Sequence, residues 1–173
     1  MGLVVNLQLT GLTNFYKSLS TNSPAILKTM KQWGARYRSF SQRRFDLFSK
    51  GGGNWPPLAE STIKRRRKGK RKSGTIAILR DTGTLFRALN PVLGQPGSFE
   101  QVAGLFTVEL GFGGASKHPN GTASIADIAK FHNFGMGHNP TRTIIVPPDA
   151  KTREAMAQDA ERNLSADGWD KTK

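Results

Sequence analysis

SPAILKTMKQWGARYRSFSQRRFDLFSKGGG, residues 23–53, contains the longest helical pattern of the chain. Its large apolar side chains recur every three or four residues, which places them on one face of a helix. Ser23 is a suitable N-cap, the proline after it fits the first helical position, and the glycines at 51–53 would end the helix. The segment therefore predicts one long helix, and its apolar face consists of Ile26, Met30, Trp33, Tyr37 and Phe40.

The opposite face of this helix is basic, and the positive charge of the chain is concentrated in the same half. The 173 residues carry a net charge of +14. Residues 1–80 contain 17 lysines and arginines against two acids, whereas residues 81–173 contain nine against ten. A basic half can face solvent, nucleic acid or an acidic protein surface, and charge alone does not distinguish these. The basic positions of the helix are Lys28, Lys31, Arg36, Arg38, Arg43 and Arg44.

A denser basic run follows the tryptophan and prolines at 55–57. Residues 64–72 comprise eight basic side chains and one glycine. So many like charges repel one another and oppose folding of the segment on its own. We therefore expect residues 64–74 to form a mobile basic loop, either solvated or ordered by an anionic partner. The side chains that could contact DNA or a partner are Lys64, Arg65, Arg66, Arg67, Lys68, Lys70, Arg71 and Lys72.

Shorter patterns complete the predicted fold. Short apolar runs predict strands at residues 3–9, 76–78, 106–110 and 143–146. Helical spacing predicts a short helix that Asp81 or Thr82 caps, with Gly83 easing the bend before it. It predicts a second helix over 125–134, which Ser124 caps and Gly135 ends, and a third at about 148–164. Strands and helices do not alternate regularly, so we expect residues 1–173 to form a single α+β domain. It would hold a mostly antiparallel sheet of three to five strands, the long helix, two or three shorter helices, and a flexible tail at 165–173.

The chain offers few residues suited to catalysis. It has no cysteine, and its histidines, His118, His132 and His138, lack metal-ligand spacing with one another or with acids. His132 falls on the apolar face of the predicted 125–134 helix, so we expect a core or interface histidine that hydrogen-bonds a backbone carbonyl. His132 and Asn133 resemble a His-Asn nuclease motif, but the strand–helix frame of that motif is missing. Neither a Gly-x-Ser-x-Gly turn nor a phosphate-binding loop occurs. We predict no enzyme activity, no cofactor and no metal.

Non-specific nucleic-acid binding is an alternative function. A basic run beside a basic helix face could neutralise several phosphates, and binding would weaken steeply with salt. No helix-turn-helix, zinc-finger or RNA-recognition pattern accompanies the charge, so any contact would be to the backbone of the nucleic acid. No apolar run approaches the roughly 20 residues of a membrane span, so we expect no membrane partner.

Four segments occur in a familiar order: NWPPLAESTIKRR, ILRDTGTLFRAL, TVELGF and IAKFHNFGMG followed by NPTRTIIVPP. Together they resemble the virion morphogenesis proteins of tailed bacteriophages, the family of tail-completion and head–tail joining proteins. The resemblance covers roughly residues 55–150. The chain departs from the family pattern in the basicity of residues 64–72 and in the segment 91–104.

The resemblance implies a structural virion protein at the head–tail junction, as a tail-completion, tail-terminator or neck protein. Copies of the chain, six by family expectation, would form a ring around the DNA channel, in contact with neighbouring neck and tail proteins. Assembly would take place in the cytoplasm of the bacterial host. The basic run would contact either packaged DNA or an acidic subunit. The implied fold and interface positions are Trp55, Pro57, Leu58, Leu79, Asp81, Thr82, Gly83, Leu85, Ala129, His132, Phe134, Gly135, Pro140 and Arg142.

Overall fold

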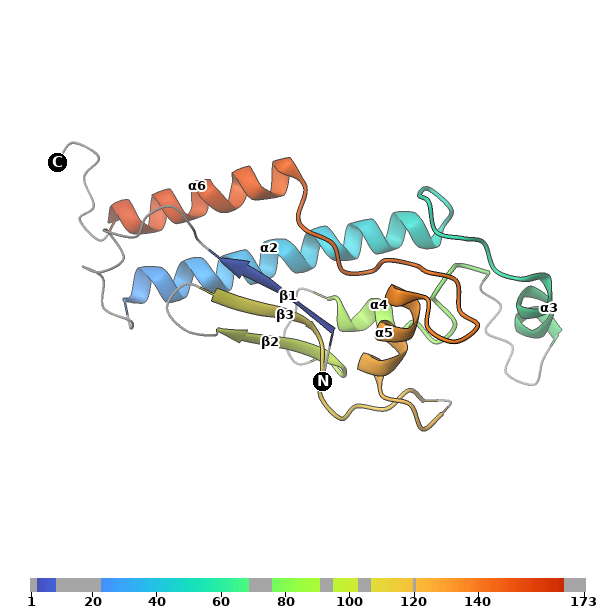
Figure 1. Cartoon of the computed structure of the whole chain (residues 1–173). Coiled ribbons are helices and arrows are strands. Elements are labelled where there is room, and N and C mark those ends of the chain that lie inside the picture. Colours follow the sequence, from blue (N-terminus) through green and yellow to red (C-terminus); the bar gives the residue numbers. More distant parts are fainter. Residues whose placement is uncertain are drawn as a thin grey trace.

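The computed structural model describes residues 3–8, 23–68, 76–90, 95–102, 107–119 and 121–166. Its fold is α+β, with one long helix, an antiparallel sheet and several shorter helices. Figure 1 shows an elongated molecule in which the long helix α2 runs through most of the length. Helix α6 and the sheet lie along the first half of α2, and the shorter helices α4 and α5 lie near its second half (Figure 1). None of the described helices is both long and apolar enough to cross a lipid bilayer.

Helix α2 spans Pro24–Ser49, as predicted. Ser23 is its N-cap residue, Pro24 is the first helical residue, and Gly51 adopts a positive φ of 89° beyond the C-terminus. All five predicted apolar-face residues are buried. At 1.5 Å per residue the helix is about 39 Å long, so it can pack against two separate groups of elements.

The sheet consists of β1 (Leu3–Gln8), β3 (Thr107–Phe112) and β2 (Ser98–Val102), in the order β1-β3-β2 with both pairs antiparallel. In the register, Leu110 of β3 lies opposite Val5 of β1 and Glu100 of β2. The central strand buries Val108, Leu110 and Phe112. The predicted strands at 3–9 and 106–110 are confirmed. Strand β2 lies in the segment 91–104, where no strand was predicted.

Two of the predicted strands are wrong, so the sheet is smaller than the five strands that the sequence allowed. Residues 76–78 lead into a turn at residues 78–79 and form no strand. The Ile78 amide donates to the Ser49 carbonyl at 2.8 Å, and Leu79 has a φ of 56°. Residues 143–146 are extended but belong to no strand. There the amides of Ile144 and Ile145 donate to the side-chain oxygen of Asn133, which takes the place of a neighbouring strand.

Among the described residues, four shorter helices accompany α2, one or two more than predicted. They are α3 (Glu60–Lys68), α4 (Thr84–Ala88), α5 (Ile125–Phe134) and α6 (Ala150–Ala166). Helix α3 is longer than expected, because the sequence indicated one helical turn at residues 59–64 and a mobile loop from residue 64 onward. The remainder of that predicted loop, residues 69–74, lies outside the described residues, as do residues 167–173 of the predicted tail. Residues 165–166 are the last turn of α6.

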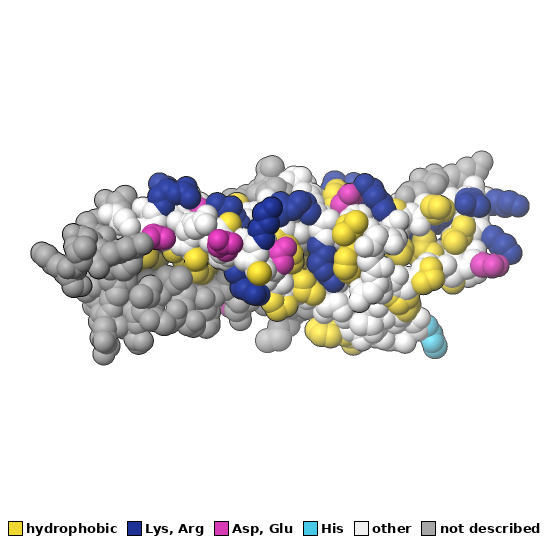
Figure 2. All heavy atoms as spheres, turned by 90° about the horizontal axis from the view of Figure 1, so that it is seen from above, with side chains coloured by type: hydrophobic (Ala, Val, Ile, Leu, Met, Phe, Trp, Pro, Cys, Tyr) yellow, Lys and Arg dark blue, Asp and Glu magenta, His cyan; other side chains and the backbone are white. Residues whose placement is uncertain are grey.

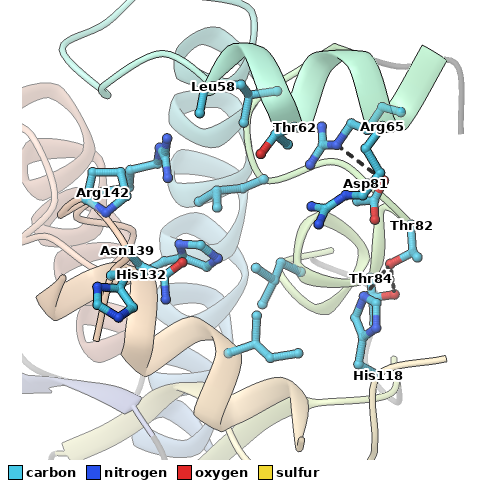
Figure 3. Close-up of a pocket in the computed structure, with 17 residues that line it drawn as sticks. Leu58, Thr62, Arg65, Asp81, Thr82, Thr84, His118, His132, Asn139 and Arg142 are labelled. Carbon is cyan, nitrogen blue, oxygen red and sulfur yellow. Dashed lines mark hydrogen bonds and ion pairs between the residues drawn. The ribbon is translucent and has the colours of Figure 1, made fainter. Parts of the chain in front are cut away.

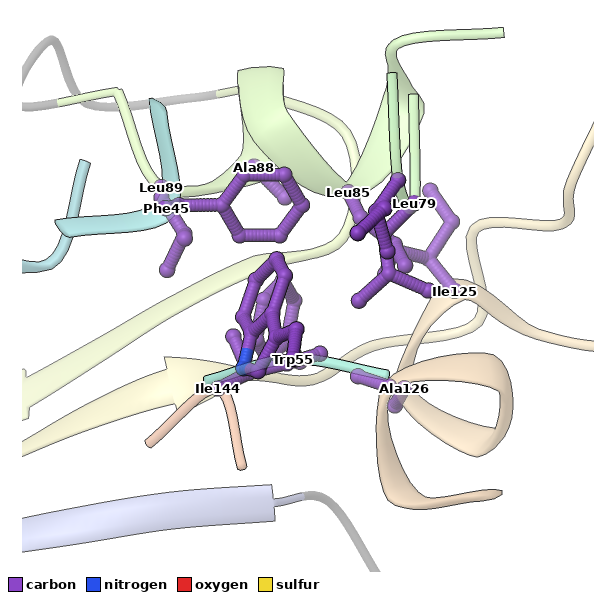
Figure 4. Close-up of a cluster of buried hydrophobic side chains, with 12 residues drawn as sticks. Phe45, Trp55, Leu79, Leu85, Ala88, Leu89, Ile125, Ala126 and Ile144 are labelled. Carbon is purple, nitrogen blue, oxygen red and sulfur yellow. The ribbon is translucent and has the colours of Figure 1, made fainter. Parts of the chain in front are cut away.

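The core has two parts along α2. The first half of α2 packs with β3 and α6, and Trp33 Nε1 donates to the Met156 carbonyl of α6 at 2.8 Å. The second half packs with Trp55, α4, α5 and Ile144. Figure 4 shows Trp55 and Phe45 at the centre of this second cluster, with ring centroids 5.1 Å apart in an edge-on arrangement. This second cluster supports the candidate site.

Part of the basic face predicted for α2 belongs to the fold. Arg36 forms an ion pair with the buried Asp159 of α6. Arg38 is buried and pairs with Glu100 of β2 at 2.8 Å. Arg44 donates to the Thr143 carbonyl at 2.8 Å. Lys28, Lys31 and Arg43 are exposed and remain available as a solvated or partner-facing surface.

Candidate functional site

A pocket of about 440 Å³ opens at the end of the molecule where α3, α4 and α5 meet (Figure 3). Its lining comes from segments that are far apart in the sequence: residues 58–66, 79–85, 118, 128–132 and 138–142. We call it the arginine–histidine pocket, because three arginines and three histidines line it. They are Arg65, Arg66, Arg142, His118, His132 and His138.

Arg142 connects two walls of this pocket. Its side chain is 4% exposed, and it donates from Nε to the Pro56 carbonyl and from Nη2 to the Pro57 carbonyl, both at 3.0 Å. Trp55 Nε1 donates in the other direction, to the Thr143 carbonyl, at 3.2 Å. These bonds hold the segment before α3 against the segment after α5. Trp55 and Arg142, both predicted as fold or interface positions, are thus in one structural unit.

His132 lies on α5 beside Arg142. The helix is capped by the Ser124 side chain, which accepts from the Asp127 amide at 3.0 Å, and it ends at Gly135 in the left-handed conformation, as predicted. The backbone carbonyl of His132 accepts a hydrogen bond from the Arg142 amide at 2.7 Å. The side chain faces the pocket, where Figure 3 shows it close to Asn139.

The prediction that His132 would bond a backbone carbonyl through its ring is wrong. Its Nδ1 is buried and has no hydrogen-bond partner among the described residues. Burial and, to a smaller extent, the positive charge of Arg142 together lower the pKa of His132 from 6.5 to about 4. The ring is therefore neutral at pH 7, with one acceptor and one donor nitrogen.

The opposite wall is organised around Asp81. Its carboxylate lies 3.3 Å from Arg66 Nε, and Arg66 also donates from Nη1 to the Ala77 carbonyl at 2.8 Å. The prediction that Asp81 or Thr82 caps α4 is wrong, because Gly83 is the N-cap with a φ of 71°. Thr82 instead shares hydrogen bonds with Thr84 at 2.7 Å and with His118 Nε2 at 2.9 Å. Asp81 thus acts as the partner of a buried arginine.

The predicted basic run is divided between the pocket and solvent. Arg66 is buried and Arg65 lines the pocket, whereas Lys64, Arg67 and Lys68 are exposed on α3. Figure 2 shows Lys and Arg side chains at the end of the molecule. Lys70, Arg71 and Lys72 lie outside the described residues. The repulsion that predicted a loop is offset at Arg66, which gains a carboxylate and a carbonyl partner on folding.

The cations around the pocket influence one another. The pKa of Arg66 is lowered from its usual value. Burial is the largest cause, the charge of Asp81 opposes it, and the charge of Arg65 adds to it. The pKa of Arg142 is lowered by burial and by Arg66. Among the described residues that line the pocket, Asp81 is the single acid against three arginines. The pocket therefore has a positive potential, which suits an anionic group.

Several residues of the pocket were predicted from the sequence as fold or interface positions, but the sequence did not show that they lie together. Asn133, which holds the extended segment after α5, was considered only as part of a weak nuclease motif. A polar residue on the buried side of a short helix, followed by a β-branched run, is the signal that could have identified it. The sequence spacing of His118 and His138 showed no sign of a shared site, yet both line the pocket. No group of three or more His, Cys, Asp or Glu able to hold a metal occurs within the described ranges.

Comparison of the chain with protein-family models, curated proteins and solved structures gives no match.

Proposed function

We propose that this chain is a structural virion protein of a tailed bacteriophage, located at the head–tail junction as a tail-completion, tail-terminator or neck protein. One observation carries the proposal. Three of the four segments that suggested the phage family meet at one end of the molecule, around the arginine–histidine pocket. Arg142 bonds the carbonyl of Pro56, 86 residues away, so these segments form one tertiary unit rather than scattered similarities.

The surface supports a role in assembly. Subunits of a ring contact two neighbours, and exposed apolar side chains commonly mark such contacts. Near the C-terminal end of α5 the exposed large apolar residues are Phe131, Phe134 and Met136. A ring of copies, six by family expectation, around a DNA channel and in contact with neighbouring neck and tail proteins would bury this patch.

Helix α3 supports contact with a polyanion inside such a ring. Its exposed Lys64, Arg67 and Lys68 lie at the end of the elongated molecule (Figure 1). Cations in this position can bind DNA phosphates without reading sequence, or an acidic neighbouring subunit. The proposed role is architectural, with the α3 cations contributing to attachment and not to catalysis.

The decisive experiment is quantitative peptide mass spectrometry on gradient-purified phage particles. We expect a few copies of the chain per particle, close to one ring, and expect them to stay with the particle through high-salt washing. If the chain is abundant in infected cells and absent from particles, the proposal is wrong.

The exposed cations of α3 also favour a second candidate, a non-specific nucleic-acid-binding protein. It predicts that the free chain binds duplex DNA with an affinity that falls steeply with salt. A variant with Lys64, Arg67 and Lys68 changed to Gln should then lose most of this binding. A Lys28→Gln, Lys31→Gln, Arg43→Gln variant, with the same charge change on α2, is the matched control. DNA binding by the free chain together with absence from particles would favour this candidate.

A further inference from the structure

Among the described residues that line the arginine–histidine pocket, three arginines stand against one acid, Asp81. Arg66 and Arg142 are buried. The charge of Arg66 helps to lower the pKa of Arg142, and the charge of Arg142 helps to lower the pKa of His132. Asp81 pairs with Arg66. An entering carboxylate would offset this repulsion, and Arg65 at the rim is exposed and can pair with it.

The lining of the pocket is partly apolar, and this restricts the kind of ligand that the pocket can bind. Leu58, Leu79, Leu85 and Ile128 contribute an apolar part of the lining. Leu79 and Leu85 are almost fully buried, so their contact surface is fixed by the core. A pocket of about 440 Å³ has room for a large side chain together with a neighbouring carboxylate, but not for a duplex. An aromatic residue flanked by acids fits this combination.

The chain itself contains such a segment. Residues 167–170 are Asp-Gly-Trp-Asp, which places a tryptophan between two carboxylates. They lie outside the described residues. Two other acids beside aromatic residues already have partners, since Asp46 pairs with Lys50 and Glu100 pairs with Arg38. Lys171 and Lys173 make residues 167–173 neutral overall, so recognition would depend on local contacts rather than on long-range attraction.

The position of α6 decides which copy could supply this segment. Helix α6 ends at Ala166, at the opposite end of the molecule from α3 and α5 (Figure 1). The next seven residues can extend about 24 Å at most. The segment follows α6 at one end of the molecule, and the pocket lies at the other end. Two copies can therefore be joined head to tail, with the segment of one copy in the pocket of the next. Repetition of such a contact closes into a ring when the rotation allows it.

We propose that the arginine–histidine pocket binds residues 167–170 of a second copy of this chain, with Trp169 on the leucines and the carboxylates of Asp167 and Asp170 on the arginines. The inference rests on the proposed function as a ring subunit and names the contact that links neighbours.

The test uses the full chain carrying Trp169→Ala, so that its own segment does not compete. A dye-labelled peptide of residues 164–173, LSADGWDKTK, is titrated against this protein by fluorescence anisotropy. We expect saturable binding, weakened roughly tenfold or more when both aspartates of the peptide are replaced by asparagine. Arg65→Gln in the protein should weaken binding similarly. Arg65 has no role in the core, so this variant should fold.

Lys31→Gln is the matched control, because it removes an exposed charge from α2, away from the pocket, and should leave peptide binding unchanged. Absence of peptide binding, or equal effects of Arg65→Gln and Lys31→Gln, overturns the inference. Presence of the chain in phage particles without peptide binding would leave the proposed function intact and remove this contact. If the chain binds the peptide but is absent from particles, the proposed contact stands and the proposed function is wrong.

Discussion

The side-chain oxygen of Asn133 accepts a hydrogen bond from the backbone amide of Ile144 at 2.8 Å, and a second from the next amide at 3.0 Å. Asn133 is 7% exposed, and the bond from Ile144 is buried while the bond from Ile145 is partly buried. One helical side chain thus holds an extended segment that would otherwise need a partner strand. The same segment carries Arg142 into the pocket, which makes Asn133 a support of the candidate site.

Asn133→Ala should destabilise the protein by about 2–4 kcal/mol, because it leaves one buried and one partly buried amide donor without an acceptor. The measurement is urea unfolding at pH 7, followed by far-UV circular dichroism. Asn139→Ala is the control, since Asn139 is exposed and its side chain bonds a single carbonyl, that of Met136. Equal stability of the two variants would contradict the role assigned to Asn133.

Sequence patterns predicted the elements whose signals are local. The spacing of apolar residues from Ile26 to Phe40, with proline at one end and glycine at the other, was sufficient for α2. Ser124 and Gly135 were likewise sufficient for α5. The segment 143–146 has strand-forming residues, but its amides bond a side chain ten or more positions away. No local pattern contains that information, so the predicted strand was wrong.

The pocket was predicted only in fragments, for the same reason. Asp81, His132 and Arg142 were each identified as fold or interface positions, but the chain path that brings them together is tertiary. The basic second half of helix α3 was missed because charge repulsion was judged within the segment. The partner that offsets it, Asp81 on Arg66, is 15 residues further along the chain.

Arg142→Gln should separate the segment before α3 from the segment after α5. The carbonyls of Pro56 and Pro57 would lose their donors in a partly buried position, and we expect a loss of about 2–4 kcal/mol in unfolding free energy. Arg87→Gln removes an exposed arginine of α4 and should cost less than about 0.5 kcal/mol. NMR titration of the Arg142→Gln protein should also show a raised pKa of His132, because one cause of its depression is gone.

Stability should fall between pH 6.5 and about pH 4 because of His132. Its pKa is about 4 in the folded chain and near 6.5 when unfolded, so in this range the unfolded state binds a proton that the folded state does not. The contribution is fully present above pH 6.5 and is lost as the pH falls toward 4. Allowing for the partial exposure of the ring, the loss should be about 2 kcal/mol.

The His132 effect is isolated by comparing urea unfolding of the parent and of His132→Gln at pH 7 and pH 4.5. The stability difference between the two proteins should shrink or change sign at the lower pH. His138→Gln, which changes an exposed histidine at the pocket rim, serves as the control and should follow the parent at both pH values. A parallel pH dependence of the parent and His132→Gln would show that His132 does not titrate as described.

Gly135 and Gly137 have nearly the same φ, 66° and 67°, but different surroundings. A Cβ at position 135 would lie 2.3 Å from Thr141 Oγ1 and 3.1 Å from the Thr141 amide nitrogen, whereas one at position 137 would meet nothing within 4 Å. Both alanine variants incur about 1 kcal/mol for the left-handed conformation. Gly135→Ala should cost a further 1–3 kcal/mol or so, because it pushes the 139–142 segment and Arg142 away from α5. Thermal unfolding of the two variants should therefore give a clearly lower Tm for Gly135→Ala, and equal values would mean that the close approach at Thr141 is not needed to position the pocket.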